Sequence, residues 1–319
     1  MMAGKDTDTE SSVTDRHEND AEIEVHKSFF QRIIETVVGN KLQLVSAIVV
    51  IAIILTGIFA PWVAPYDPDK TYQPLQEPNS HSNVFDDGEQ VDVWHPLGTD
   101  SFGHDVLSRI IFGTRISLLV AFSTVIIAFS IGTTIGLVAG YKGGRIDDLL
   151  MRYIDFQWAF PELVLAIAVI AFIGGLGVMN VIIAISLAYV DDFARLVRGE
   201  TLWIREEEYI KAAKVLGMTD GRIMSREILP NAVAPIIVQA TIMIPLAILA
   251  EASLSFLGLG VSPATPTWGL LISEGRSHIL SGWWISVMPG IAIVLTVLSF
   301  NILGDGLRDS FDITEVKEK

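Results

Sequence analysis

The chain has 319 residues, half of them hydrophobic, and a mean hydropathy of +0.48, which is more apolar than a soluble domain of this size needs to be. It contains no cysteine, which excludes disulfides and thiolate metal sites. Its formal net charge of −15 disfavours binding to the anionic backbone of nucleic acids, so we expect no nucleic-acid partner.

The apolar residues come in blocks that contain no Asp, Glu, Lys or Arg. These blocks run over residues 42–66, 116–141, 163–190, 228–250 and 277–304. Each is longer than the roughly 20 residues that a helix needs to cross about 30 Å of hydrocarbon. The sequence therefore predicts an all-α polytopic membrane protein.

Residues 1–41 are polar and acidic, with residues 1–28 expected to be disordered and a short amphipathic stretch at 29–38 leading into the first block. They lack a short apolar core followed by small residues, so we expect no cleaved signal peptide. The acidic runs at 6–20 and 86–92 favour a host with a salty cytoplasm and surroundings. A disordered acidic tail would explain the same charge, and both interpretations stay open.

Basic residues indicate which connecting segments face the cytoplasm. They crowd the end of the second block, at residues 142–152, and the central polar segment, at residues 195–226. By contrast, residues 66–108 contain only Lys70 as a basic residue. We therefore expect both termini, the 142–152 turn and the central segment to be cytoplasmic, and residues 66–105 to be extracellular.

The third block, 163–190, decides the number of crossings. As one helix it would be about 42 Å long and would place the two basic segments on opposite faces of the membrane. Two crossings, joined by the glycines of residues 174–177, place both basic segments inside. The six expected spans lie at about 42–63, 117–140, two within 155–192, 234–257 and 283–304.

This plan divides the chain into four parts. Residues 1–41 are the cytoplasmic acidic tail with its lead-in, and residues 42–116 hold the first span and the long extracellular segment. Residues 117–312 form the membrane domain, with a central loop at about 198–230. Residues 313–319 are a second cytoplasmic tail.

The composition of the central loop predicts a helix, a glycine turn and a second short helix. Its first half has apolar residues at near-helical spacing, at Ile204, Ile210, Ala213 and Leu216. Gly217 is expected to end this helix, since glycine reaches left-handed dihedral angles without penalty. Thr219 and Asp220 are expected to cap the second helix, and Pro230 to end or kink it.

Ala212 and Ala213 lie side by side in the first of these helices. Two small side chains would let another protein approach the backbone closely, which makes the loop a candidate docking surface. A charged helix–turn–helix between two spans is more often a solvated loop, and the residues alone favour that simpler interpretation.

Two acidic residues near the spans are candidates for a polar path through the membrane, because a lone charge is costly to bury there. They are Glu162, at a helix start, and Glu251, near the outer end of its helix. The simpler interpretation, which the residues favour, places Glu251 at the interface and makes Glu162 a cap or a solvated group. Asp155 is expected to pair with Arg152 as a structural contact.

The remaining motifs do not point to an enzyme. The pairs Gly258-Leu-Gly260 and Gly304-Asp-Gly306 are fragments of a phosphate loop, and no complete one occurs, so any ATP would be bound by another chain. We expect these glycines to allow close packing or turns. The loosely spaced His95, His104 and Asp105 rarely make a metal site, and we expect none.

Several stretches nevertheless agree, in order and spacing, with one family. They are 95–100 (His-Pro-Leu-Gly-Thr-Asp), 105–109, 113–118, 143–147, 160–161, 254–260, 266–269 and 301–309, together with the Ala-Ala, glycine and Ile-Leu-Pro pattern of the central loop. From about residue 29 to 312 the chain resembles the C-type permease of dipeptide/oligopeptide ABC importers. Lys211 stands in place of a glutamate of the loop motif, and Asp191-Asp192 replace an aromatic-proline pair.

The resemblance implies the type I ABC-importer permease fold with six transmembrane helices and a cytoplasmic coupling helix, in the cell membrane. It implies a homologous B-type permease, two ATPases and an extracellular solute-binding protein as partners. The chain itself would bind no cofactor, because ATP and magnesium belong to the ATPases. The residues implied in coupling are Glu208, Lys211, Ala212, Ala213, Gly217 and Asp220, with Leu229 and Pro230 at the joint to the fifth span.

Three other functions remain open at this point. A nickel-chelate or other small-solute importer of the same family is the nearest, since much of the substrate choice lies in the binding protein. An intramembrane hydrolase would use Asp155, Glu162 or Glu251. A passive channel would carry its solute without ATP.

Overall fold

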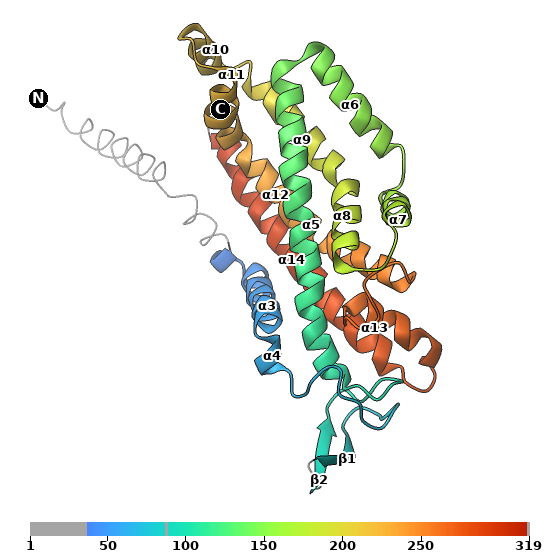
Figure 1. The fold of residues 1–319 in the computed structure, drawn as a ribbon. Coiled ribbons are helices and arrows are strands. Elements are labelled where there is room, and N and C mark those ends of the chain that lie inside the picture. The colour runs from blue at the N-terminus through green and yellow to red at the C-terminus, as the bar shows by residue number, and fades with distance from the viewer. Residues whose placement is uncertain (1–36, 87–88, 318–319) are drawn as a thin grey trace, which may run out of the picture.

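The computed structural model describes residues 37–86 and 89–317. The expected acidic tail and most of its amphipathic lead-in lie outside these residues. The regular elements of these described residues are helices and one small β-hairpin (Figure 1), so the all-α prediction holds for the membrane part.

Among the described residues, four helical segments are long and apolar enough to cross a membrane. They are α3 (Lys41–Ile58), α5 (Val106–Lys142), the segment Asp220–Phe256 that contains α12 (Leu229–Phe256), and α14 (Trp284–Lys317). All four lie within predicted spans or extend them. At 1.5 Å per residue, the 37 residues of α5 reach about 55 Å, well beyond the hydrocarbon. The helix α14 also continues into the segment that we expected to be a tail.

The third block forms two segments, as expected, but neither is a simple span. Helices α6 (Gly144–Trp158) and α7 (Glu162–Ile173) meet at a bend of 95° and count together as a fifth candidate span. Pro161 lies at this bend, where it cannot continue a helix from the preceding turn. The bend places Asp155 and Glu162 in different helices, whereas we expected both in one.

The returning segment consists of α8 (Val178–Ala188) and α9 (Val190–Ile204). The turn before it uses the predicted glycines, since Gly174 and Gly175 have φ of +76° and +80°. Eleven residues of α8 give only about 16 Å, so a sixth crossing needs part of the more polar α9. The predicted count of six is therefore met only approximately.

Helix α5 packs closely against α9 along a row of glycines. Gly132, Gly136 and Gly140 recur every four residues, and a Cβ on Gly136 would lie 2.4 Å from the carbonyl oxygen of Ala194. Small residues at this spacing let two membrane helices approach at backbone distance. This row of glycines, which we call the glycine seam, holds α9 against α5. The central loop, which follows α9, is thereby held at the end of α5.

The long polar segment, residues 66–105, contains a hairpin that we did not expect. Strands β1 (Ser80–Asp86) and β2 (Glu89–His95) pair antiparallel, with Ser80 opposite His95. Figure 1 places this hairpin and α13 (Trp268–Gly275) at one end of the bundle. The helices α10 (Glu208–Val215) and α11 (Asp220–Ile223) lie at the other end, with the carboxy-terminal part of α14. The basic segments thus share one end, as their charge predicts.

Candidate functional site

The central loop has the predicted helix, turn and short helix. The turn at Gly217 has φ of +79°, and its amide donates to the Lys214 carbonyl at 3.0 Å. The next amide, of Met218, donates to the Ala213 carbonyl at 3.1 Å, which completes a Schellman motif. A Cβ on Gly217 would meet no described atom within 4 Å, so the backbone conformation, and not space, favours glycine here.

The second short helix begins at the expected residues, but contacts with α5 and not a Thr219 cap hold its first turn. Thr219 occupies the N-cap position, yet its side chain makes no capping hydrogen bond with any described residue. The Asp220 carboxylate instead accepts from the Tyr141 hydroxyl at 3.0 Å and from the Lys142 ammonium. The loop is thereby attached to the last turn of α5.

The chain does not end its helix at Pro230. Helix α11 continues through a π-helical turn, Met224–Ile228, into α12, and Pro230 lies in the first turn of α12. Proline lacks an amide donor and clashes with the carbonyl four residues earlier, and a wider π turn there relieves both. Pro230 is exposed and Leu229 is half-buried at this joint.

The two alanines of the loop face different ways. Ala213 is 8% exposed and packs with the fully buried Ile210 in the core of the bundle, whereas Ala212 faces solvent. The pair does not form the joint open surface that we expected, because a helix turns about 100° between neighbours. Glu208 and Lys211 are exposed, and the Lys211 ammonium lies 3.8 Å from the Glu206 carboxylate.

The most exposed apolar residues of the loop were not among the predicted site residues. Val215 is 88% exposed and Leu216 is 84% exposed at the tip between α10 and the Gly217 turn. We expected Leu216 on the internal face of the helix, but it is the C-cap residue, where the chain leaves the helical course. The exposure of these two apolar side chains marks the tip as a candidate contact surface, and helical spacing in the sequence did not show it.

Two further polar contacts fix the loop to the bundle. The Arg205 guanidinium donates to the Gly140 carbonyl at 2.6 Å, at the end of the glycine seam. The Arg198 guanidinium makes a bidentate pair with the Asp147 carboxylate at 2.6 and 2.7 Å. Such charge-assisted contacts are geometrically specific. They join the ends of α5, α6 and α9 into one unit beneath α10.

Glu251 is buried inside the bundle and lines none of the three cavities of about 210, 450 and 510 Å³. Its side chain is fully buried, and its carboxylate accepts from the hydroxyls of Ser255 at 2.7 Å and Ser117 at 3.3 Å. The Ser117 hydroxyl also accepts from the amide of Trp268 at 3.3 Å. The carboxylate therefore joins α5, α12 and the start of α13.

Glu162 is exposed at the start of α7 and lines two neighbouring cavities of about 210 and 510 Å³. Glu251 lines neither of these cavities. Asp155 does not have its expected partner: its carboxylate lies 2.9 Å from the Arg195 guanidinium. Asp155 lies in α6 and Arg195 in α9, so this pair joins two helices that pack together in the fold.

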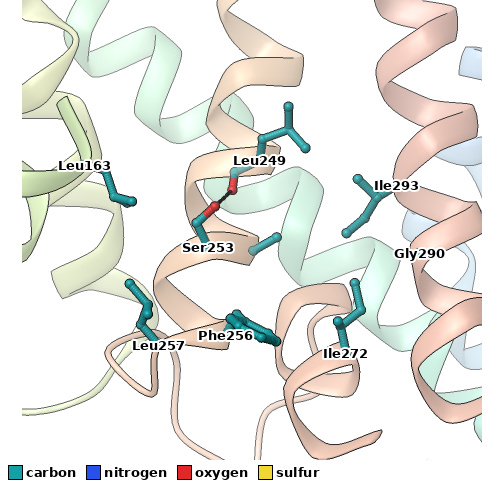
Figure 2. Close-up of a pocket in the computed structure, with 9 residues that line it drawn as sticks. Leu163, Leu249, Ser253, Phe256, Leu257, Ile272, Gly290 and Ile293 are labelled. Carbon is teal, nitrogen blue, oxygen red and sulfur yellow. Dashed lines mark hydrogen bonds between the residues drawn. The ribbon is translucent and has the colours of Figure 1, made fainter. Parts of the chain in front are cut away.

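A third cavity, of about 450 Å³, lies between α7, α12, α13 and α14 (Figure 2). Figure 2 shows Leu163 and Ile293 pointing toward α12 from opposite sides, and the Ser253 hydroxyl donating to the Leu249 carbonyl at 2.7 Å. Apart from Ser253, its described lining is apolar.

His95 and His104, in the polar segment of residues 66–105, have protein partners. His95 pairs with Asp105 at 2.9 Å, and the same carboxylate caps α5 by accepting from the Ser108 amide at 2.8 Å. His104 pairs with Asp100 at 2.9 Å. These two pairs are separate, so His95, His104 and Asp105 do not converge on one point. They hold this polar segment on the start of α5.

An ion pair joins this segment to α13. The Arg109 guanidinium lies 2.6 Å from the Asp100 carboxylate and 2.7 Å from that of Glu274. Burial raises the pKa of Glu274 above its usual value, although Arg109 acts in the opposite direction. Helix α13 is thus held against the start of α5.

Comparison with known proteins identifies the family. Residues 132–313 match the model of the binding-protein-dependent transport system inner membrane component, and residues 28–80 match the N-terminal TM domain of oligopeptide transport permease C. The chain is 45% identical to a dipeptide transport system permease of Alkalihalophilus pseudofirmus over 86% of each chain. It is 41% identical to a di/tripeptide transport permease of Pseudomonas aeruginosa, covering 86% of this chain and 88% of that one.

A glutathione transport permease of Escherichia coli is 43% identical, over 85% of this chain and 86% of that one. Among solved structures, an inward-facing MetNI methionine ABC transporter matches with a TM-score of 0.52 at 18% identity, over 63% of this chain and 96% of that one, which shows the fold alone. The chain therefore belongs to the family of binding-protein-dependent transport system inner membrane components and is a permease subunit of an ABC importer.

Proposed function

We propose that the chain is the C-type permease of an ATP-driven importer of dipeptides and short oligopeptides. The observation that carries this is the 45% identity to a dipeptide permease over 86% of the chain, together with the match of residues 28–80 to the oligopeptide permease domain. The relatives reported above are named for peptide or glutathione transport. A nickel-chelate importer is the second candidate.

Uptake by a strain that lacks this gene separates the two substrates. We expect loss of ATP-dependent uptake of labelled dialanine with nickel uptake unchanged, and recovery when the gene is restored. Loss of nickel uptake alone would contradict the peptide assignment. Dialanine flux through the purified chain alone, without ATP, would favour a passive channel instead.

The need for separate ATPase partners follows from the lack of a phosphate-binding loop in this sequence. It contains no phosphate-binding loop, so ATP and magnesium would be bound by two separate ATPase subunits. A homologous permease would supply the other half of the path, and an extracellular binding protein would deliver the substrate. The cavities of about 210 and 510 Å³ that Glu162 lines would belong to this chain's half of the path.

The exposed tip of the central loop supports a docking role for it. Val215 and Leu216 present apolar surface beside the small Ala212, and such clusters mark protein contacts. In this proposal the loop faces the cytoplasm, as do both termini, and the ATPase covers the tip. Glu208, Lys211 and Asp220 form the polar rim.

Movement of the ATPases would pass from the tip to the spans by two connections. One is the continuous helix from α11 through the π turn into α12. The other is the contact of Asp220 and Arg205 with the end of α5. Closure of the ATPases would then shift α5 and α12 together and alternate the access of the path between the two sides.

A further inference from the structure

The three cavities described above share lining residues, so they are neighbours, and we treat them together as one groove. The cavities of about 510 and 210 Å³ share Glu162 and Ala188, and the cavities of about 210 and 450 Å³ share Leu249 and Ser253. Leu163 lines all three. We call this the α7–α12 groove. It runs from the α6–α7 bend to α13, whose end of the bundle also holds the hairpin.

The two ends of the groove differ in chemistry. The end near α13 is lined by aliphatic and aromatic side chains, with Ser253 as its polar residue (Figure 2). The end near the bend has the aromatic Trp158 and Phe160 and the carboxylates of Glu162 and Asp191. Of the described residues that line the groove, none is Lys or Arg.

The charges near the bend leave Glu162 unbalanced. Asp191 is buried and accepts from the Gln157 amide at 3.2 Å. The neighbouring Arg195 is engaged elsewhere, with its guanidinium 2.9 Å from Asp155 and 4.6 Å from the centre of the Trp158 ring. Glu162 is exposed to the groove and has no hydrogen bond or ion pair within the part of the chain that the structure describes.

We propose that the α7–α12 groove is the wall along which the substrate crosses, and that Glu162 receives its cationic group, an ammonium such as a free amino terminus or a lysine side chain. The inference rests on the proposed transport of peptides and specifies how this chain selects among them. Charge complementarity decides the occupant: a lipid chain would fill the apolar end but leave the carboxylate of Glu162 without a cation. A carboxylate beside aromatic rings in a poorly solvated groove attracts an ammonium strongly.

The apolar end carries no group that distinguishes one peptide side chain from another. Peptides of different sequence pass it alike, while Glu162 favours cationic substrates over anionic ones. The chain therefore adds a charge filter to the selection made by the binding protein. This filter acts on the rate of crossing, and not on capture of the substrate outside.

The lack of native cysteine allows a direct measurement of this filter. Ser253→Cys places one thiol of this chain in the groove with little change of size. In the complete reconstituted importer, we compare the rates at which methanethiosulfonate ethylammonium and methanethiosulfonate ethylsulfonate modify it. We expect the cationic reagent to react faster. Replacing Glu162 by Gln should reduce that preference by about tenfold, because the carboxylate acts oppositely on the two reagents.

Matched variants separate charge from structure. Glu251→Gln removes a carboxylate that is buried and does not line the groove, so it should leave the preference unchanged. Glu162→Asp keeps the charge and should retain the preference, which shows that any loss in Glu162→Gln does not come from misfolding. A preference that is absent, or that survives Glu162→Gln, would overturn the inference.

Transport gives the second measurement. In Glu162→Gln, the maximal uptake rate of Ala-Lys relative to Ala-Glu should fall several-fold, while the half-saturating concentrations, set by the binding protein, stay the same. An unchanged ratio would overturn the inference even if dipeptides are carried. If no dipeptide is carried but the thiol preference depends on Glu162, the peptide assignment fails and the cation-selective groove stands.

Discussion

At Gly217 the chain turns back on itself at the tip of the central loop, with φ of +79°. A side chain with a Cβ is strained there by about 1 kcal/mol, and a β-branched one by more. We predict that Gly217→Val distorts the Schellman turn, lowers peptide uptake and weakens ATPase binding, while the thermal stability of the membrane part changes little. The measurement is uptake together with copurification of the ATPase.

Gly217→Asn is the control for this change, since asparagine adopts left-handed dihedral angles more readily than other residues with a Cβ. It should retain most of the uptake. Full uptake by Gly217→Val would show that the turn does not depend on the glycine.

Leu216 offers a sharper test of the docking surface. At 84% exposure it contributes little to folding, so Leu216→Asp should change the unfolding free energy by less than about 0.5 kcal/mol. If the side chain inserts into the ATPase, its loss costs about 2 kcal/mol of binding, or roughly thirtyfold in affinity. We predict that the ATPase no longer copurifies with a tagged permease.

The chain provides a matched control at the other end of the bundle. Leu280 is 98% exposed beyond α13, so Leu280→Asp makes the same chemical change away from the loop. It should leave copurification intact. If the ATPase still copurifies with Leu216→Asp, Leu216 is not part of the interface.

The sequence predicted a helix correctly where one uncharged apolar block of the sequence forms one helix in the structure. Helices α3, α5, α12 and α14 follow their blocks, and the glycines of residues 174–177 form the predicted turn. Positions that depend on tertiary contacts were not predictable. The contact of α6 with α9 gave Asp155 the partner Arg195, and the depth of Glu251 in the bundle depends on three elements that meet only in the fold.

The hairpin was missed although the sequence contains a signal for it. Asp87 and Gly88, between the two strands, are a dipeptide that favours two-residue hairpin turns. The polar composition of residues 66–105 concealed this signal. At the candidate site, helical spacing identified Ile204, Ile210 and Ala213 as internal but misplaced Leu216, because spacing does not show where a helix ends.

The attachment of the loop to α5 makes a prediction at the level of elements. Lys142→Asp places two carboxylates together where Asp220 now accepts from Lys142, so α11 should separate from the end of α5. We predict that uptake per ATP hydrolysed falls, while hydrolysis and the stability of the protein in detergent persist. Both groups are at the surface, so the pair contributes little to folding.

The reversed pair, Lys142→Asp with Asp220→Lys, restores opposite charges and should recover much of the coupling. Tyr141 donates to Asp220 in the native pair, so recovery is expected to be partial. If the single variant transports with native efficiency, the contact does not transmit the movement of the ATPase.

Across the whole molecule, the two ends of the bundle differ in structure and charge. One end has α10, α11 and the basic segments, and the other has the hairpin, α13 and the Arg109–Glu274 ion pair (Figure 1). The α7–α12 groove lies between them. The account requires the end with α10 to face the cytoplasm, because the ATPase must reach the tip and the substrate must enter at the other end.

Labelling from each side of the membrane tests this requirement most directly. Leu216→Cys and Leu280→Cys each give the chain a single exposed thiol, because it has none of its own. We predict that a membrane-impermeant maleimide labels Leu280→Cys in intact cells, and labels Leu216→Cys only in inverted vesicles stripped of the ATPase. Labelling of Leu216→Cys from outside intact cells would contradict the orientation and the coupling mechanism together.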